Sequence, residues 1–427
     1  MQPIANRTRK ESDPIGWMLL IALVFGGVAV WGFAEVAIPI FDETHYLPAA
    51  RAWVAGEILL NPEHPVLGKQ MIATSIRLLG DNPVGWRAGS VLFGVLTLFA
   101  MMRMTWAASG SRFAALAAGV LAASNFLLLV QSRVAMLDIY MLGFLMLGCW
   151  SLVAAGTGKA VRPRVILAGV MFGLSLAVKW NAAPVIAFAG ACVFLGNLRA
   201  KVIKDARRPL DDMTIYEAFV WLALLPVAIY LASYTTIWLL DNPNPRFHGP
   251  VSWQGYMLDL QESVKKDHPY MSRWWQWVVD WRPIWYFYEE YEGDWRGMLF
   301  LGNPITMLAG LVGLVGCLWL GLVRGRMDCL MAAGAWAAAL ALWIVAPKPV
   351  QFYYHYLISA QFLMVALALA LDHWVWRNPP WRLHRRLAPA FVAASALLFV
   401  YFIPILTTQP LPKKTSFADY AWFQNWR

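Results

Sequence analysis

Long apolar runs alternate with short polar connections along most of this sequence. Each run has about the length that one helix needs to cross the hydrocarbon core of a bilayer. The runs cover residues 16–39, 84–106, 112–130, 136–155, 163–180, 182–198, 215–239, 303–323, 329–346, 353–371 and 387–405. Lys179 to Asn181 divide the fifth run from the sixth, because one uninterrupted helix would be longer than a bilayer requires. The pattern predicts an all-α polytopic membrane protein with about eleven transmembrane helices.

Composition supports the same class. The chain has 427 residues, of which 59% are hydrophobic and 14% are charged. Soluble domains hold about 25% charged residues, so a soluble protein of this composition would lack polar surface. The sequence shows no repeat and no polar linker, and it therefore predicts a single transmembrane domain over residues 1–427.

Basic residues concentrate in every second connection, beginning before the first run. Those that define the pattern most clearly are Arg7, Arg9, Lys10, Arg103, Arg112, Arg324 and Arg326. Such connections are expected on the cytoplasmic side, which places the N-terminus inside and the C-terminus outside. Contact with anionic membrane lipids explains the net charge of +10, so we expect no nucleic-acid partner.

Two long connections and a tail from Thr407 are predicted on the outer face. The first connection, residues 40–83, opens with the acidic pair Asp42 and Glu43 and continues into a short surface helix over 47–60. The second, residues 240–302, is rich in Trp and Tyr, which favour the boundary between lipid and water. We expect it to lie on the membrane surface, where its rings form an anchoring belt or line a passage to the site.

Further polar side chains gather on the same predicted face, beside apolar runs. They are His45, Tyr46, His64, Lys69, Arg133, Asp138, Lys179, Trp180, His268, Lys348, Tyr354 and His355. Charge next to a membrane span is costly, so its recurrence on one face favours a shared site over independent solvated groups. Each residue also has a structural interpretation: a helix-end acidic pair, an ion pair between Arg133 and Asp138, or lysines that reach for the headgroups.

One acid surrounded by cations suits a substrate that carries a phosphate on a lipid. Arg133, Lys348 and Lys69 are the candidate ligands of that phosphate, since Arg and Lys offset its charge. A neutralised phosphate leaves as a stable anion, so the reaction needs only one base, whereas glycoside hydrolysis needs two carboxylates. Asp42, Glu43 and His45 do not have a diagnostic metal spacing. We therefore predict no cofactor and no metal ligands.

An ordered set of motifs over residues 41–356 resembles the protein O-mannosyltransferase family. The set begins with Phe41-Asp42-Glu43-x-His45-Tyr46 and His64-Pro65-Val66-Leu67-Gly68-Lys69, followed by Ser132-Arg133-x-x-Met136-Leu137-Asp138 and Lys179-Trp180. It continues with His268-Pro269-Tyr270, Leu301-Gly302-Asn303-Pro304 and Tyr354-His355-Tyr356. Val66 stands where the family motif has a second proline, and the short segment at 240–302 fits the bacterial members.

The resemblance implies a GT-C glycosyltransferase fold in a bacterial inner membrane, with surface helices on the outer face. It implies inverting transfer of mannose from polyprenyl-phosphate-mannose to Ser/Thr hydroxyls of an acceptor polypeptide, as that chain emerges from the translocon. By motif, Asp42 is the general base and Glu43 orients donor or acceptor, while Arg133 and Lys348 hold the donor phosphate. The other residues named above bind substrate or support the site.

Two alternatives remain open from the sequence. A related transferase could use the same parts on a lipid or glycan acceptor. A flippase for lipid-linked sugars would share the multispan architecture, but it needs polar groups through the membrane, whereas the charges here concentrate on one face.

Overall fold

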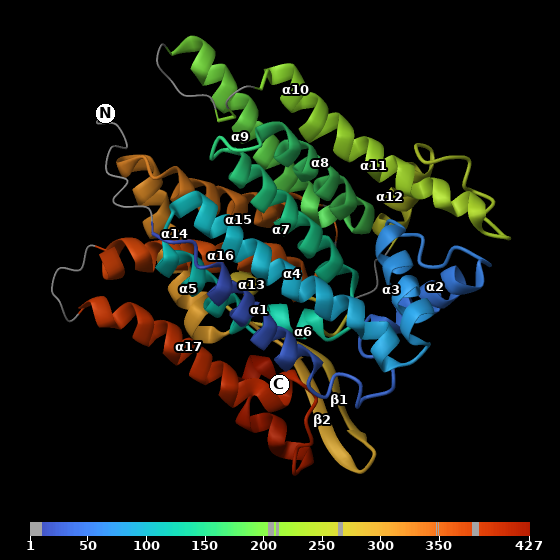
Figure 1. The fold of residues 1–427 in the computed structure, drawn as a ribbon. Coiled ribbons are helices and arrows are strands. Elements are labelled where there is room, and N and C mark those ends of the chain that lie inside the picture. Colours follow the sequence, from blue (N-terminus) through green and yellow to red (C-terminus); the bar gives the residue numbers. More distant parts are fainter. Residues whose placement is uncertain are drawn as a thin grey trace.

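The computed structural model describes residues 11–203, 209–210, 213–263, 268–346, 348, 350–377 and 384–427. The basic residues Arg7, Arg9 and Lys10, on which the orientation of the N-terminus partly depends, lie outside the described residues. Figure 1 shows a bundle of long helices with shorter helices and one hairpin gathered at one end.

Nine helical stretches among the described residues are long and apolar enough to cross a membrane. They contain α4 (Pro83–Ser109), α7 (Leu137–Ala155), α8 (Val161–Val178), α9 (Ala183–Val202), α10 (Ile215–Phe219) with α11 (Leu225–Ser233), α14 (Pro304–Arg324), α15 (Met327–Val345), α16 (Leu357–Leu371) and α17 (His384–Leu406). Two shorter apolar helices, α1 (Ile15–Val30) and α5 (Arg112–Ala123), complete the set. Each of the eleven predicted spans therefore contains an apolar helix, and the polytopic all-helical bundle is confirmed.

Two spans are shorter than the hydrophobic pattern predicted. α1 ends at Val30 instead of continuing to residue 39, because the chain turns at Gly32, whose φ is +63°. α5 ends at Ala123, and α6 (Leu127–Ser132) follows after a break at Phe126, whose φ is +65°. The Asn303 side chain donates to the carbonyl of Ser124 at 2.9 Å and so satisfies a backbone group that this break leaves unpaired.

The first connection forms two helices at one end of the bundle. α2 (Glu43–Ala55) begins four residues before the predicted surface helix and ends at Gly56, which adopts the left-handed conformation that favours glycine. α3 (Leu67–Leu79) was not predicted, and it packs against α2, α4 and α8. In Figure 1 both helices lie together in blue at the end of the bundle.

The aromatic-rich second connection contains two helices and a hairpin. α12 (Trp253–Ser263) and α13 (Trp274–Val278) precede β1 (Ile284–Tyr291) and β2 (Asp294–Phe300), which pair antiparallel with Ile284 opposite Phe300. The hairpin corrects the expectation of helices only. Its turn is Glu292-Gly293, with φ of +53° and +87°, as tight hairpins require.

Residues 407–427 form a tail that packs on the hairpin. Leu411 pairs with Trp295 of β2, and the indole of Trp285 donates to the carbonyl of Trp426 at 2.9 Å. The Arg133 guanidinium donates to the Thr407 carbonyl at 2.9 Å, and Arg296 donates to the Thr408 carbonyl at 3.0 Å. The tail and the first connection therefore lie at the same end of the bundle.

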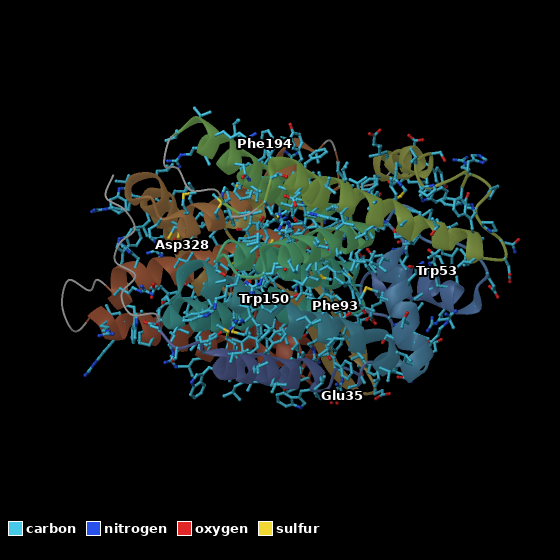
Figure 2. The ribbon with its side chains drawn as sticks, turned by 45° about the horizontal axis from the view of Figure 1, so that its top comes forward. Glu35, Trp53, Phe93, Trp150, Phe194 and Asp328 are labelled. Carbon is cyan, nitrogen blue, oxygen red and sulfur yellow. The ribbon has the colours of Figure 1, made fainter. Side chains whose placement is uncertain are left out.

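The centre of the bundle is the span that contains α16. Tyr353–Arg377 is 94% buried inside the protein, whereas Ile215–Leu239 is only 17% buried and Arg385–Leu406 only 22%. The apolar sequence of the peripheral helices therefore faces outward, as lipid contact requires. Figure 2 shows Trp53 and Asp328 toward opposite ends of the bundle, with Phe93 and Trp150 between them.

Candidate functional site

Asp42 occupies the N-cap position of α2, directly after the irregular chain that leaves α1. Its backbone carbonyl accepts hydrogen bonds from the amides of His45 and Tyr46, at 2.9 and 3.1 Å, so the helix fixes its backbone. The side chain is half-buried. Among the described residues, no hydrogen bond or ion pair engages its carboxylate. The group is therefore free to meet a substrate.

The surroundings of Asp42 tune its basicity. Burial raises the pKa of this carboxyl to about 6. The positive charges of Lys179, His45 and Lys348 oppose that rise, and the negative charge of Asp138 adds to it. A carboxylate with this pKa is ionised at neutral pH yet holds a proton more strongly than an ordinary Asp, which suits a general base.

Glu43 lies next to Asp42 in sequence but has entirely different surroundings. One carboxylate oxygen accepts from Arg87 Nε and the Ala135 amide, and the other accepts from the Arg87 guanidinium and the Ile40 amide, all at 2.8 Å. These four bonds fill the lone-pair sites of a carboxylate, and the side chain is 0% exposed. The expectation that Glu43 orients donor or acceptor is corrected: it anchors the start of α2.

Arg87 completes that anchor, and sequence reasoning missed it. Besides Glu43, its guanidinium donates to the carbonyls of Phe33, Val36 and Ile38 at 2.7 to 3.0 Å. It thereby holds the connection from α1 to α2 along most of its length. A charged residue inside the apolar run 84–106 was the signal in the sequence, since such residues rarely lack a buried partner.

Two lysines face the Asp42 region from other elements. Lys179 Nζ donates to Asp138 at 2.7 Å, and the pair is almost completely buried. The second oxygen of Asp138 is buried without a hydrogen-bond partner. Lys348 Nζ donates to the Gln261 amide oxygen at 2.9 Å, and burial together with the nearby Lys179 lowers its pKa to about 8. Both ammonium groups are therefore charged at neutral pH and lack a full set of counter-charges.

Neutral and aromatic side chains complete the surroundings. Burial and the neighbouring lysines, Lys179 foremost, hold the pKa of His64 well below its usual value, so its imidazole is neutral. The rings of Tyr46 and His64 are 6.2 Å apart, and burial followed by the charge of Asp42 raises the pKa of the Tyr46 phenol. Lys179 lies 5.0 Å from the ring centre of Tyr354. His45 is exposed at the rim.

Two predicted phosphate ligands lie elsewhere. Arg133 donates to the carbonyls of Val28, Ala29 and Trp31, where α1 ends, and is 1% exposed. It holds a helix C-terminus, and it forms no ion pair with Asp138, which bonds to Lys179 instead. These contacts correct its assignment to the donor phosphate.

Lys69 is likewise structural. It is 0% exposed, and its ammonium donates to the carbonyls of Asn61 and His64, at 2.9 Å for the latter. Burial lowers its pKa to about 7. The side chain thus holds the loop before α3 and does not reach the site, which corrects its assignment as a phosphate ligand.

The remaining candidates lie around the site. The Trp180 indole donates to the Tyr230 hydroxyl at 2.6 Å. The His355 ring stacks on Trp343 at 3.7 Å between ring centres, and its Nδ1 accepts from the Phe352 amide. His268 is exposed and lies 5.1 Å from the Phe352 ring. All three support the walls of the site, and none contacts Asp42.

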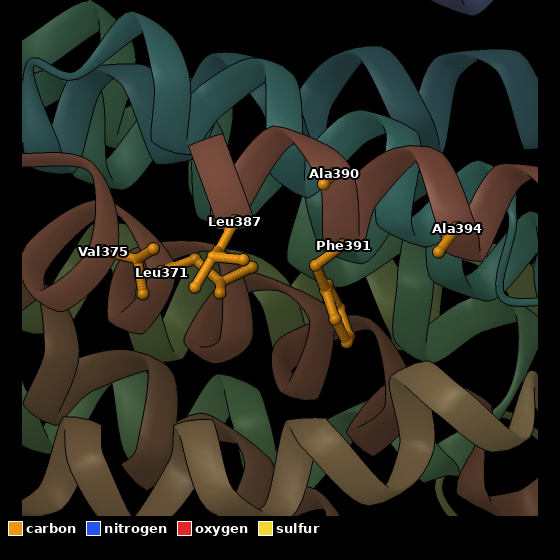
Figure 3. A pocket seen from close by; sticks show the side chains of 6 residues that line it. All are labelled: Leu371, Val375, Leu387, Ala390, Phe391 and Ala394. Atoms are coloured by element: carbon orange, nitrogen blue, oxygen red, sulfur yellow. The ribbon is translucent and has the colours of Figure 1, made fainter. Parts of the chain in front are cut away.

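Neither a metal centre nor a reactive hollow competes with this cluster in the described part of the chain. No group of three or more His, Cys, Asp or Glu residues there could hold a metal ion. An apolar hollow between α16 and α17 is lined by Leu371, Val375, Leu387, Ala390, Phe391 and Ala394 (Figure 3). It lies near the beginning of α17, away from Asp42, and its lining has no group that could perform chemistry.

Comparison with known proteins gives consistent matches. The family "Dolichyl-phosphate-mannose-protein mannosyltransferase" matches residues 79–240, and the "C-terminal four TMM region of protein-O-mannosyltransferase" matches residues 247–426. A protein of Corynebacterium glutamicum named polyprenol-phosphate-mannose–protein mannosyltransferase is 26% identical, over 97% of this chain and 94% of the relative. A protein of the same name from Mycobacterium tuberculosis is 24% identical, over 96% and 91%.

Solved structures share the fold. The Saccharomyces cerevisiae Pmt1-Pmt2 complex bound to the sugar donor matches with a TM-score of 0.81 and 13% identity, over 96% of this chain and 92% of that one. ArnT from Cupriavidus metallidurans, bound to undecaprenyl phosphate, matches with a TM-score of 0.62 and 14% identity, over 92% and 71%. The helical bundle described above is therefore a GT-C-like fold.

Proposed function

Because the chain belongs to the protein O-mannosyltransferase family, we propose that it transfers mannose from a polyprenyl-phosphate-mannose donor to hydroxyl groups of protein acceptors. The observation that carries this proposal is the Asp42 carboxylate, which is unbonded, half-buried and less acidic than usual, beside two incompletely neutralised lysines. We place the reaction at the outer face of a bacterial inner membrane, where the positive-inside rule puts this end of the bundle.

The transfer requires one base. Asp42 accepts the proton of a Ser or Thr hydroxyl while the hydroxyl oxygen attacks the anomeric carbon of mannose. The bond from that carbon to the phosphate oxygen breaks, and the electron pair leaves with the polyprenyl phosphate. Attack from the face opposite the leaving group inverts the anomeric centre.

Lys348 and Lys179 are the groups that we assign to the leaving phosphate, in place of Arg133 and Lys69. Lys348 has only the neutral Gln261 amide as a partner, so an anion can approach it without displacing a carboxylate. Lys179 already pairs with Asp138, and that pair holds its ammonium near Asp42. Charge neutralisation by two cations removes the need for a general acid or a metal in this scheme.

Acceptor class and transport are the remaining alternatives. The relatives that match are named as protein mannosyltransferases, which supports a polypeptide acceptor over a lipid or glycan. A flippase would leave Asp42 without a chemical role, although this carboxylate is the unbonded group of the cluster.

The test is Asp42→Asn, assayed with synthetic polyprenyl-phosphate-mannose and a Ser/Thr-rich peptide. We expect transfer to fall by about 10²- to 10⁴-fold, the usual contribution of a general base, while the thermal stability in detergent is retained. Wild-type transfer in a folded Asp42→Asn enzyme would falsify the assignment. Lipid translocation without a glycosylated product would instead favour the flippase.

A further inference from the structure

Phe41, the residue directly before Asp42, has an unusual backbone. Its φ is +53°, a left-handed conformation that bulky L-residues rarely adopt because Cβ approaches the carbonyl oxygen. Such a conformation persists only where the surrounding structure enforces it, and it commonly marks functional sites. The direction in which the chain delivers Asp42 therefore depends on whatever holds Phe41.

The Phe41 ring is held by Tyr286 of the hairpin. The two rings are parallel to within 5°, with 4.2 Å between their centres, and Tyr354 contacts Phe41 edge-on at 6.0 Å. The opposite side of the column is closed by Phe300, whose ring is parallel to Tyr286 within 3° at 5.1 Å. Tyr286 is thus the middle ring of a column that ends on the residue before Asp42.

Tyr286 is itself placed by an irregularity. Trp285 pairs with Leu299 and Phe287 pairs with Met298, so Tyr286 is the extra residue of a bulge in β1. Bulges redirect a side chain away from the regular alternation of a strand. The ring is 4% exposed, and its hydroxyl accepts a hydrogen bond from the Gln131 side chain at 2.8 Å, which fixes its far end.

Two independent backbone irregularities therefore meet in one contact. We infer that Tyr286 is a positioning residue for the transfer reaction, which fixes Phe41 and thereby the place of the Asp42 carboxylate. The inference rests on the proposed function only in taking Asp42 as the base. It gives the 240–302 segment a role in the site, because a hairpin about 240 positions along the chain from Asp42 sets the geometry of that carboxylate.

Loss of the column should change the protonation of Asp42 as well as its place. The ionisable groups that face this carboxylate from the first connection, α7, the α8–α9 turn and the 348 turn are His45, Tyr46, Asp138, Lys179 and Lys348. None of them lies on the hairpin, so replacement of Tyr286 leaves these charges in place and admits water beside the carboxylate. The pKa of Asp42 should then fall toward the ordinary value of about 4.

The experiment compares Tyr286→Leu with Tyr286→Phe and Tyr288→Leu in the full-length enzyme. Tyr288 is a matched control on the same strand, where its ring contacts Phe417 of the tail and does not contact Phe41. Carbodiimide labelling of Asp42, followed by peptide mass spectrometry between pH 4 and 8, reports its protonation without requiring activity. Steady-state kinetics with polyprenyl-phosphate-mannose give kcat and the donor KM.

We expect Tyr286→Leu to move the labelling midpoint from about 6 toward about 4 and to lower kcat roughly ten- to hundredfold with little change in donor KM. Tyr286→Phe, which keeps the stack, and Tyr288→Leu should both keep the wild-type midpoint. An unchanged midpoint in Tyr286→Leu, or an equal change in Tyr288→Leu, overturns the positioning role. Because labelling is independent of transfer, that outcome is distinct from retained transfer in Asp42→Asn, which overturns the proposed function.

Discussion

Two groups of charges lie side by side where α2 begins, and their hydrogen bonding is opposite. The Glu43–Arg87 anchor is saturated, since each carboxylate oxygen accepts twice and the guanidinium also binds three backbone carbonyls. Around Asp42, by contrast, the carboxylate is unbonded and one oxygen of Asp138 has no partner. A saturated ion pair has no remaining valence for a substrate, whereas an incompletely bonded cluster gains partners when one arrives. The comparison separates structural from chemical charge in adjacent residues.

The largest expected effect breaks the saturated side. Glu43→Ala leaves the Arg87 guanidinium buried without its counter-charge, and such a loss costs about 3–5 kcal/mol of folding free energy. Thermal unfolding in detergent should show a much lower midpoint for Glu43→Ala, whereas Asp42→Asn should unfold at or above the wild-type temperature. Equal midpoints for the two variants would contradict the distinction between anchor and site.

The pH dependence of kcat/KM sharpens the chemical side. Activity should rise with pH as Asp42 ionises, with a midpoint near 6, and decline above about 8 as Lys348 loses its proton. On the acid side we expect about a tenfold fall per pH unit. The linked effect on folding has the opposite sign: because the folded pKa of Asp42 is raised, its contribution to stability is present in acid and is lost as the pH rises from about 4 to 6. An acid limb near pH 4 would argue against Asp42.

The two lysines divide in the same way. Lys348→Met should raise the donor KM by about tenfold, the usual worth of one charge-assisted hydrogen bond, with an unchanged unfolding temperature. Lys69→Met should lower the unfolding temperature, because the carbonyls of Asn61 and His64 lose their donor. A weaker effect on KM in Lys348→Met than in Lys69→Met would reverse the assignment of the phosphate ligand.

The smallest expected effect concerns Gln261. Its amide donates to the Glu63 carbonyl at 2.7 Å and accepts from Lys348, so it joins α12 to the first connection and to the cation. Gln261→Met should free Lys348 and raise the donor KM by about threefold, since each neutral bond is worth about 0.5–1.5 kcal/mol. Gln254→Met on the same helix, where the amide contacts Pro250 and Tyr230, serves as the control.

Hydrophobic pattern was sufficient for the bundle and insufficient for the site. Apolar runs located all eleven helices, because lipid imposes a length and a composition on each span. The pattern could not show that α1 stops at Val30, since apolar residues continue into a chain whose carbonyls bond to arginines instead of to a helix. Motif resemblance placed Asp42, Lys179 and Lys348 correctly at one end. It could not rank Glu43, Arg133 and Lys69 below them, because burial and saturation depend on partners such as Arg87 and the carbonyls of distant helix ends.

The hold of Arg133 on Thr407 joins residues 274 positions apart, and it sets an order on biosynthesis. Arg133, the end of α1 and the hairpin all emerge from the ribosome before residues 407–427 exist. Until then, one arm of the Arg133 guanidinium and the free edge of β2 wait without their partners. The outer end of the enzyme is therefore assembled last, after the final span has been delivered, and a nascent chain remains unfinished at the very place where it would act.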